Sequence, residues 1–276
     1  MQPVTKLRSL IRYIRCFRNW PVIAFARYRR PRQLQPVSLL LRNGFRLTFR
    51  PGSDYTAVGE VFVGGSYDSI VDLADAPPVC VWDVGGNIGA FVVWAAALFP
   101  AAHFVSFEPV PETFALLQRN QRENAAIDWT VQPFALGDRA QMLDLYIPHE
   151  QFGQASRYGS EGRRIEVSMR AIEQVWVSEG RPVIDLMKLD CEGGEYAILD
   201  ALVGPMLGAV RNIVMETHTI QDHEPSELSA RLQAAGFVLE PVAARNPNML
   251  WARWGGDNGA SGRPAAPMGV TECDIG

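Results

Sequence analysis

Short apolar runs alternate with amphipathic segments over most of the chain, and this alternation predicts its secondary structure. The apolar runs are typical of buried strands, and most are followed by a longer segment whose apolar residues recur at helical spacing. The predicted strands are 79–84, 103–108, 130–135, 184–190, 212–216, 237–242 and 249–254. The predicted helices are 89–99, 111–124, 171–177, 195–202 and 225–235.

This order of elements predicts an α/β fold, in which a mostly parallel sheet carries helices on both faces. The last two predicted strands are separated only by a short loop, so we expect them to form a hairpin. One strand would then run antiparallel to the others. An open sheet of this kind binds ligands beyond the carboxyl ends of its strands.

The first strand ends in a glycine-rich turn, residues 83–89, which reads Asp-Val-Gly-Gly-Asn-Ile-Gly. Such a turn lets the main chain approach a bound nucleotide closely. A dinucleotide-binding turn has the spacing Gly-x-Gly-x-x-Gly, whereas Gly85 and Gly89 are spaced Gly-x-x-x-Gly. The carboxylate of Asp83 would repel a pyrophosphate but suits a ligand with a cationic end, such as S-adenosylmethionine.

The composition is that of a globular protein with one sizeable core, since 47% of the 276 residues are hydrophobic and 20% are charged. Four cysteines are present: Cys16, Cys80, Cys191 and Cys273. They show no paired metal-ligand spacing, and Cys80 and Cys191 fall in segments predicted to be buried. A reducing cytoplasm is the simpler inference.

The net charge of −4 is unevenly distributed, because residues 1–50 contain twelve Lys or Arg and no acid. Leu7, Leu10, Ile11, Ile14 and Phe17 recur there at helical spacing. The spacing predicts an amphipathic cationic helix that ends near Pro21. Two interpretations stay open: attachment to an anionic membrane or acidic partner, or packing on the domain with the arginines in water.

The chain is expected to divide into three parts. Residues 1–50 form the basic arm, which also contains a predicted hairpin, 38–41 and 45–49; residues 51–254 form the main domain; and residues 255–276 lack a core-forming pattern and are expected to be disordered. Residues 148–165 show no clear period. They are either a lid near the ligand crevice or a tolerated surface insertion.

Two further sites carry candidate binding residues. Glu108 ends the second predicted strand nineteen residues after Gly89, where an acid accepts hydrogen bonds from ribose hydroxyls. Its alternative role is that of an acid at a helix N-terminus. The segment 135–138, Ala-Leu-Gly-Asp, closes the third strand. It either borders an adenine ring or is a plain turn.

Charged residues crowd the end of the fourth predicted strand, where Lys188 is followed by Asp190 and Glu192. Placing several carboxylates together at a sheet edge costs free energy unless they pair with cations or take part in binding or catalysis. His218, which follows the fifth strand, is a candidate general base, because the unperturbed pKa of histidine lies near neutrality. The alternative is a surface histidine. No closed metal motif is present, so no metal is expected.

With these residues in view, the chain resembles the FkbM family of S-adenosylmethionine-dependent methyltransferases. The resemblance is carried by residues 81–89, 107–109, 135–138 and above all 186–195. It implies a Rossmann-like class I methyltransferase sheet of seven strands in the order 3-2-1-4-5-7-6, with strand 7 antiparallel. It also implies methyl transfer to oxygen, often on a sugar or natural product. Residues 169–172, Met-Arg-Ala-Ile, depart from the acid that the family often has there.

The residues and the resemblance together give the expected site. The expected cofactor-binding residues are Asp83, Gly85, Gly86, Asn87, Gly89, Glu108, Ala135 and Asp190, and the expected catalytic residues are His218, Asp190 and Glu192. The acceptor would be a small-molecule or glycan hydroxyl. Nucleic acid is not expected, because the main domain is acidic. The alternative is a non-catalytic binding module of the same fold, recruited to a membrane by the basic arm.

Overall fold

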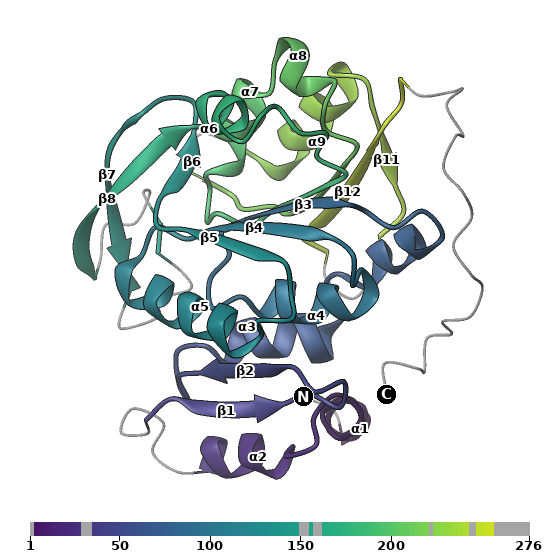
Figure 1. The fold of residues 1–276 in the computed structure, drawn as a ribbon, viewed down its shortest axis with the longest axis vertical. Coiled ribbons are helices and arrows are strands. Elements are labelled where there is room, and N and C mark those ends of the chain that lie inside the picture. The colour runs from purple at the N-terminus through teal and green to yellow at the C-terminus, as the bar shows by residue number, and fades with distance from the viewer. Residues whose placement is uncertain are drawn as a thin grey trace.

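A seven-stranded sheet forms the centre of the protein (Figure 1). The structure is a computed structural model that describes residues 3–28, 35–148, 155–156, 162–220, 223–242 and 247–256. The strands are β3 (Cys80–Val84), β4 (His103–Phe107), β5 (Trp129–Gln132), β9 (Leu186–Leu189), β10 (Asn212–Glu216), β11 (Phe237–Glu240) and β12 (Met249–Trp254). Their spatial order is β11-β12-β10-β9-β3-β4-β5. β12 runs antiparallel to both of its neighbours, β10 and β11, and the other pairings in this sheet are parallel. Counted along the chain, this is the order that the resemblance implies.

Helices cover both faces of this sheet, as predicted (Figure 1). On one side lie α3 (Tyr55–Gly59), α4 (Ala90–Leu98) and α5 (Pro111–Glu123), and on the other lie α6 (Ile172–Ser178), α7 (Glu195–Ala201), α8 (Gly204–Leu207) and α9 (Pro225–Ala234). Successive residues of a strand point to opposite faces, so Val81 belongs to one apolar cluster and Trp82 to the other. The sheet therefore separates two cores.

The third predicted strand, 130–135, is split in the structure. Its first part is β5, whereas Ala135 begins β6 (Ala135–Gly137), which joins a separate three-stranded sheet with β7 (Gln141–Ile147) and β8 (Arg163–Ala171). The loop predicted for 148–165 is therefore too long, because β8 begins at Arg163; residues 149–154 and 157–161 lie outside the described part. Buried and exposed residues alternate through most of β8, which is the period of a half-buried strand.

The N-terminal arm packs on the same core. It consists of α1 (Pro3–Cys16), α2 (Pro21–Tyr28) and the hairpin of β1 (Val37–Leu40) and β2 (Arg46–Phe49). Leu39 and Phe49 are fully buried in the apolar cluster that includes α4, so the boundary at residue 50 does not separate two cores. The predicted end near Pro21 is wrong, because α1 ends at Cys16 and Pro21 opens α2, a position that suits proline.

An irregular segment connects the arm to β3. It contains α3, a π-helical turn η2 (Glu60–Gly64) and a 3₁₀ helix η3 (Asp68–Asp75), for which the sequence predicted no regular element. Over the described residues, no helix is long and apolar enough to cross a lipid bilayer.

The buried side chain of Asn120 ties three segments together. Its Oδ1 accepts from the backbone N–H of Thr48 at 2.7 Å, and its Nδ2 donates to the carbonyls of Thr48 at 2.9 Å and Ile88 at 2.7 Å. Helix α5, the hairpin and the glycine turn are thus joined through one amide.

Asn120→Ala is expected to lower the free energy of unfolding by about 3 kcal/mol, because it leaves buried backbone groups without partners. Denaturant unfolding followed by circular dichroism measures the change. Arg119→Ala is the control on the same helix: it removes a partly exposed ion pair with Glu123 and should cost less than about 1 kcal/mol. Equal stabilities of the two variants would contradict the role of Asn120.

Candidate active site

The glycine turn that follows β3 lies against two neighbouring strands. The backbone N–H groups of Gly85 and Gly86 both donate to the carbonyl of Phe107, at 3.0 and 2.9 Å. Gly85 has a φ of 77°, and a Cβ added to it would collide with the carbonyl of Asp190. A Cβ on Gly89 would strike the Trp129 ring. These two positions therefore require glycine.

A buried lysine of the neighbouring strand β9, Lys188, contacts the glycine turn. Its ammonium donates to the carbonyl of Gly85 at 2.6 Å and lies 3.1 Å from Asp83 Oδ1 and 3.5 Å from Asp190 Oδ2. Burial alone would lower the pKa of Lys188, but Asp83 and the neighbouring groups raise it well above its ordinary value. The lysine stays charged and links the ends of β3 and β9.

This pairing occupies the carboxylate of Asp83, which the sequence led us to expect at the cofactor. Its carboxylate is fully buried, pairs with Lys188 and also accepts from Ser106 Oγ at 2.9 Å. In the described part of the chain, neither Asp83 nor Gly89 lines the two cavities at the carboxyl edge of the sheet. Both residues contact protein groups on the side of the turn that faces away from the cavities.

The first cavity encloses about 840 Å³ including its open mouth, and Glu108 is one of the residues that line it. The carboxylate accepts from the N–H groups of Asn87 at 2.9 Å and Val110 at 2.8 Å. Burial raises the pKa of Glu108 to about 7, against the effect of these hydrogen bonds. Apolar side chains form much of the wall: Leu136, Leu143, Leu145 and Met169. Sequence reasoning missed the last three, which belong to β7 and β8.

The second cavity is more polar. Ser53, Thr56, Glu60, Tyr67, Lys188, Glu216 and His218 contribute to its lining. The two cavities share Asn87, Asp190 and Glu192, so they adjoin along the glycine turn. The structure thus brings most of the predicted residues together, because Gly85, Ala135 and Glu108 line the first cavity and Gly86 and His218 line the second.

Sequence reasoning missed the wall that the segment before β3 supplies to the second cavity. Glu60 lies in η2, and Tyr67 lies between η2 and η3. The Tyr67 hydroxyl donates to Asp190 Oδ2 at 3.5 Å. Over the described residues, no three His, Cys, Asp or Glu side chains are placed to hold a metal ion.

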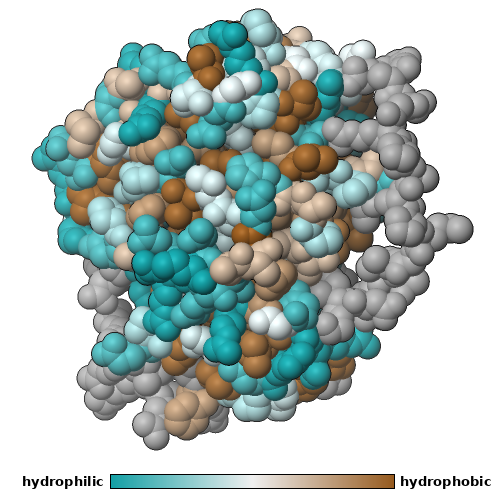
Figure 2. Space-filling view, viewed as in Figure 1, coloured by the Kyte–Doolittle hydropathy of each residue, from teal (hydrophilic) through white to brown (hydrophobic). Residues whose placement is uncertain are grey.

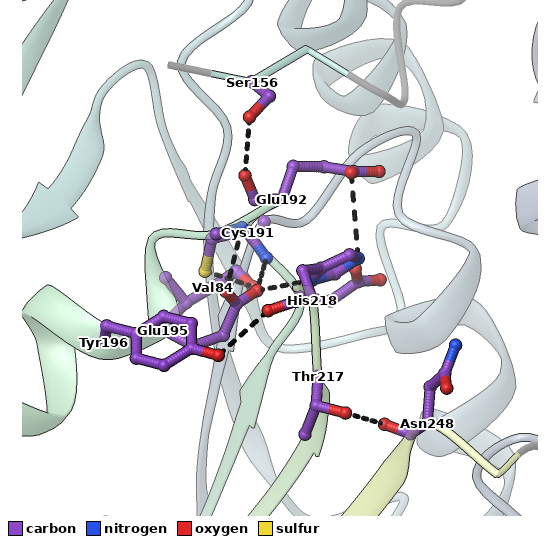
Figure 3. Close-up of polar contacts among 12 residues, drawn as sticks. Val84, Ser156, Cys191, Glu192, Glu195, Tyr196, Thr217, His218 and Asn248 are labelled. Atoms are coloured by element: carbon purple, nitrogen blue, oxygen red, sulfur yellow. Dashed lines mark hydrogen bonds and ion pairs between the residues drawn. The ribbon is translucent and has the colours of Figure 1, made fainter. Parts of the chain in front are cut away.

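His218 lies between two glutamates of the segment after β9 (Figure 3). Its Nδ1 is 3.0 Å from Glu195 Oε1, and its Nε2 is 3.7 Å from Glu192 Oε2. Glu195 is fully buried and also accepts from the N–H groups of Cys191 and Gly193, at 2.7 and 2.9 Å. Glu195 therefore fixes the turn and the ring, whereas Glu192 faces the cavities.

The charges of this cluster shift its pKa values. Burial lowers the pKa of His218, but Glu195 and Glu192 outweigh it and raise the value to about 9. Burial and neighbouring acids raise the pKa of Glu192 to about 7, although His218 opposes them. His218 is thus protonated at neutral pH, unlike the neutral base that the sequence suggested, and Glu192 titrates near neutrality. The backbone of Glu192 has a φ of 51°, a left-handed conformation that residues other than glycine rarely adopt.

Glu195→Gln is expected to bring the pKa of His218 down from about 9 toward the ordinary value near 6.5, as measured by NMR titration of the ring. Because the folded-state pKa is raised, the stabilisation from this pair is full below about pH 6.5 and is lost as the pH rises through about 9. Glu227→Gln, beside His223, is the control that should leave His218 unchanged. An unshifted His218 in Glu195→Gln would rule out the pairing.

Comparisons with known proteins show the family of this chain. A family model described as the methyltransferase FkbM domain matches residues 83–239. The chain is 28% identical over 216 residues to methyltransferase sdnD of Sordaria araneosa, covering 65% of this chain and 80% of that protein. It is 27% identical over 201 residues to the 31-O-demethyl-FK506 methyltransferase FkbM of Streptomyces tacrolimicus, covering 62% and 76%.

Among solved structures, the magnesium protoporphyrin IX methyltransferase of Synechocystis PCC 6803 aligns with a TM-score of 0.43 and 14% identity, over 84% of this chain and 91% of that chain. The family model is the stronger finding, because it matches more than half of the residues, from the glycine turn to β11. The chain therefore belongs to the FkbM family of S-adenosylmethionine-dependent methyltransferases.

Proposed function

We propose that this protein transfers a methyl group from S-adenosylmethionine to a hydroxyl of a small molecule or glycan. The observation that carries the proposal is the pair of adjoining cavities, one with a carboxylate and apolar walls and the other with a titratable glutamate beside a histidine. Asn87, Asp190 and Glu192 belong to both, so a ligand in the first meets a ligand in the second.

The first cavity fits the nucleoside part of the cofactor. Each oxygen of Glu108 already accepts one backbone N–H, but a carboxylate has about four lone-pair sites, so both oxygens can still accept from ribose hydroxyls. Leu136 and Met169 offer apolar contacts to an adenine ring. The carboxylate of Asp190, which keeps 27% side-chain exposure, suits the ammonium of the amino acid part.

The second cavity fits an acceptor whose hydroxyl must lose a proton. When bound, S-adenosylmethionine supplies an electrophilic methyl group, whose bond to sulfur breaks as the acceptor oxygen bonds to carbon. Glu192 takes the hydroxyl proton, because its pKa of about 7 leaves much of it ionised at neutral pH. Protonated His218 holds Glu192 in place, and Glu195 holds His218.

Two arguments support an oxygen acceptor and catalysis. The relative from Streptomyces tacrolimicus is named as a methyltransferase that acts on a 31-O-demethyl compound. Carboxylates whose pKa is raised by burial are costly to keep. The pKa is raised in this way in buried Glu108 and in half-buried Glu192 and Glu60. A non-catalytic binding module has no physical need for this cluster.

Glu108→Gln is expected to weaken S-adenosylmethionine binding by about 10–100-fold in calorimetry, because it removes charge-assisted hydrogen bonds to the ribose. Glu173→Gln, at an exposed position of α6, is the control and should bind like the unaltered protein. Unchanged affinity of the Glu108→Gln protein would refute the ribose role, and absence of binding to the unaltered protein would refute the proposed function.

Glu192→Gln is expected to slow methyl transfer by about 10²–10⁴-fold, the usual contribution of a general base, while cofactor binding persists. The assay supplies methyl-labelled S-adenosylmethionine to extracts of hydroxylated metabolites, and mass spectrometry identifies products labelled on oxygen. Exposed Glu179→Gln is the matched control. Label on nitrogen or carbon, or full activity of Glu192→Gln, would count against the proposal.

A further inference from the structure

Helix α1 contacts the segment that supplies Glu60, Val61 and Tyr67 to the lining of the second cavity. The guanidinium of Arg12 donates to the carbonyl of Val63 at 3.0 Å and pairs with Asp68 at 3.0 Å. Cys16 Sγ lies 3.6 Å from the carbonyl of Phe62 on the same segment. The inward side of the helix is therefore anchored by polar contacts to η2 and to the first residue of η3.

The opposite side of α1 presents aliphatic side chains to water. Leu10 is 39% exposed and Ile11 is 41% exposed. Arg15, one turn after Ile11, is exposed as well. At 100° per residue, Leu10 and Ile11 lie on the side opposite to Arg12 and Cys16, and Arg15 lies at the edge between the two sides. The apolar side chains of a surface helix normally face the core. In α1, Tyr13 and Cys16 pack against the core, whereas Leu10 and Ile11 remain at the surface.

We propose that this outer face of α1, formed by Leu10, Ile11 and Arg15, docks on an anionic lipid membrane. The charge distribution supports this partner. Residues 1–53 contain twelve basic residues and no acid, whereas the rest of the chain contains 14 basic and 30 acidic residues, a net charge of −16. A negative surface therefore attracts the arm and repels the remainder, which orients the molecule.

The exposed aliphatic residues favour a bilayer over a soluble polyanion. A helix lying in the membrane surface places its apolar side chains at the boundary between headgroups and acyl chains, while its arginines meet the lipid phosphates. A nucleic acid or acidic protein would bind the charges without needing Leu10 and Ile11. Figure 2 shows hydrophobic and hydrophilic residues side by side at the end of the molecule where the N-terminal elements lie.

The test uses the full chain, because removing the arm would uncover Phe17 and Leu39, which are fully buried. The intact protein is expected to float with vesicles of phosphatidylcholine and phosphatidylglycerol at about 0.1 M salt, and less at about 0.5 M salt or with phosphatidylcholine alone. Leu10→Gln with Ile11→Gln should lower partitioning at least about tenfold, and Arg15→Gln about fivefold.

The control is Val203→Gln with Val238→Gln, which changes two valines that are 59% and 56% exposed outside the arm and should leave partitioning unchanged. Circular dichroism checks folding, and Ile11→Gln alone replaces the double variant if that variant does not fold. The proposal is overturned if the intact protein does not bind anionic vesicles at low salt, or if the Leu10 and Ile11 substitutions have no effect. Binding to heparin that depends on Arg15, without binding to vesicles, would assign the face to a soluble polyanion instead.

Discussion

The active-site end of the sheet depends on one buried cation, the ammonium of Lys188. It meets acceptors from three places in the chain: Asp83 at the end of β3, the carbonyl of Gly85 in the glycine turn, and Asp190 after β9. Asp83 is fully buried and Lys188 nearly so, and a buried charge that loses its partner is strongly destabilising. The pair thereby fixes how two neighbouring strands present the turn to a ligand.

This arrangement divides the acids of the site into two groups. Asp83 and Glu195 are fully buried and serve other protein groups, namely Lys188 and His218. Asp190 and Glu192 are their counterparts at the cavity surface, each with 27% of the side chain exposed. Each buried acid pairs with a cation, and each cation in turn pairs with an acid that lines the cavities. The buried acids therefore position the acids at the cavity surface.

The sequence was sufficient for the main sheet and for the position of Glu108 at its carboxyl edge, because period and spacing along the chain report directly on strands and on their carboxyl ends. It did not predict that Asp83 pairs with Lys188, since an acid at a strand end looks the same whether it faces a ligand or a lysine of the next strand. The walls formed by Leu143, Leu145 and Met169 were also missed. Their strands belong to a second sheet, and only tertiary contacts bring them to the cavity. The pKa of His218 likewise depends on partners that come together only on folding.

We infer that Lys188 and Asp83 act as one unit that positions the glycine turn for the cofactor. A double-mutant cycle on S-adenosylmethionine affinity, with Asp83→Asn, Lys188→Met and the double variant, tests it most directly by calorimetry. We expect each single change to weaken binding and the double change to weaken it little further, with an interaction free energy of about 1.5 kcal/mol or more. Effects that simply add, or single variants that bind like the unaltered protein, would show that Lys188 and Asp83 do not act as a unit on the glycine turn.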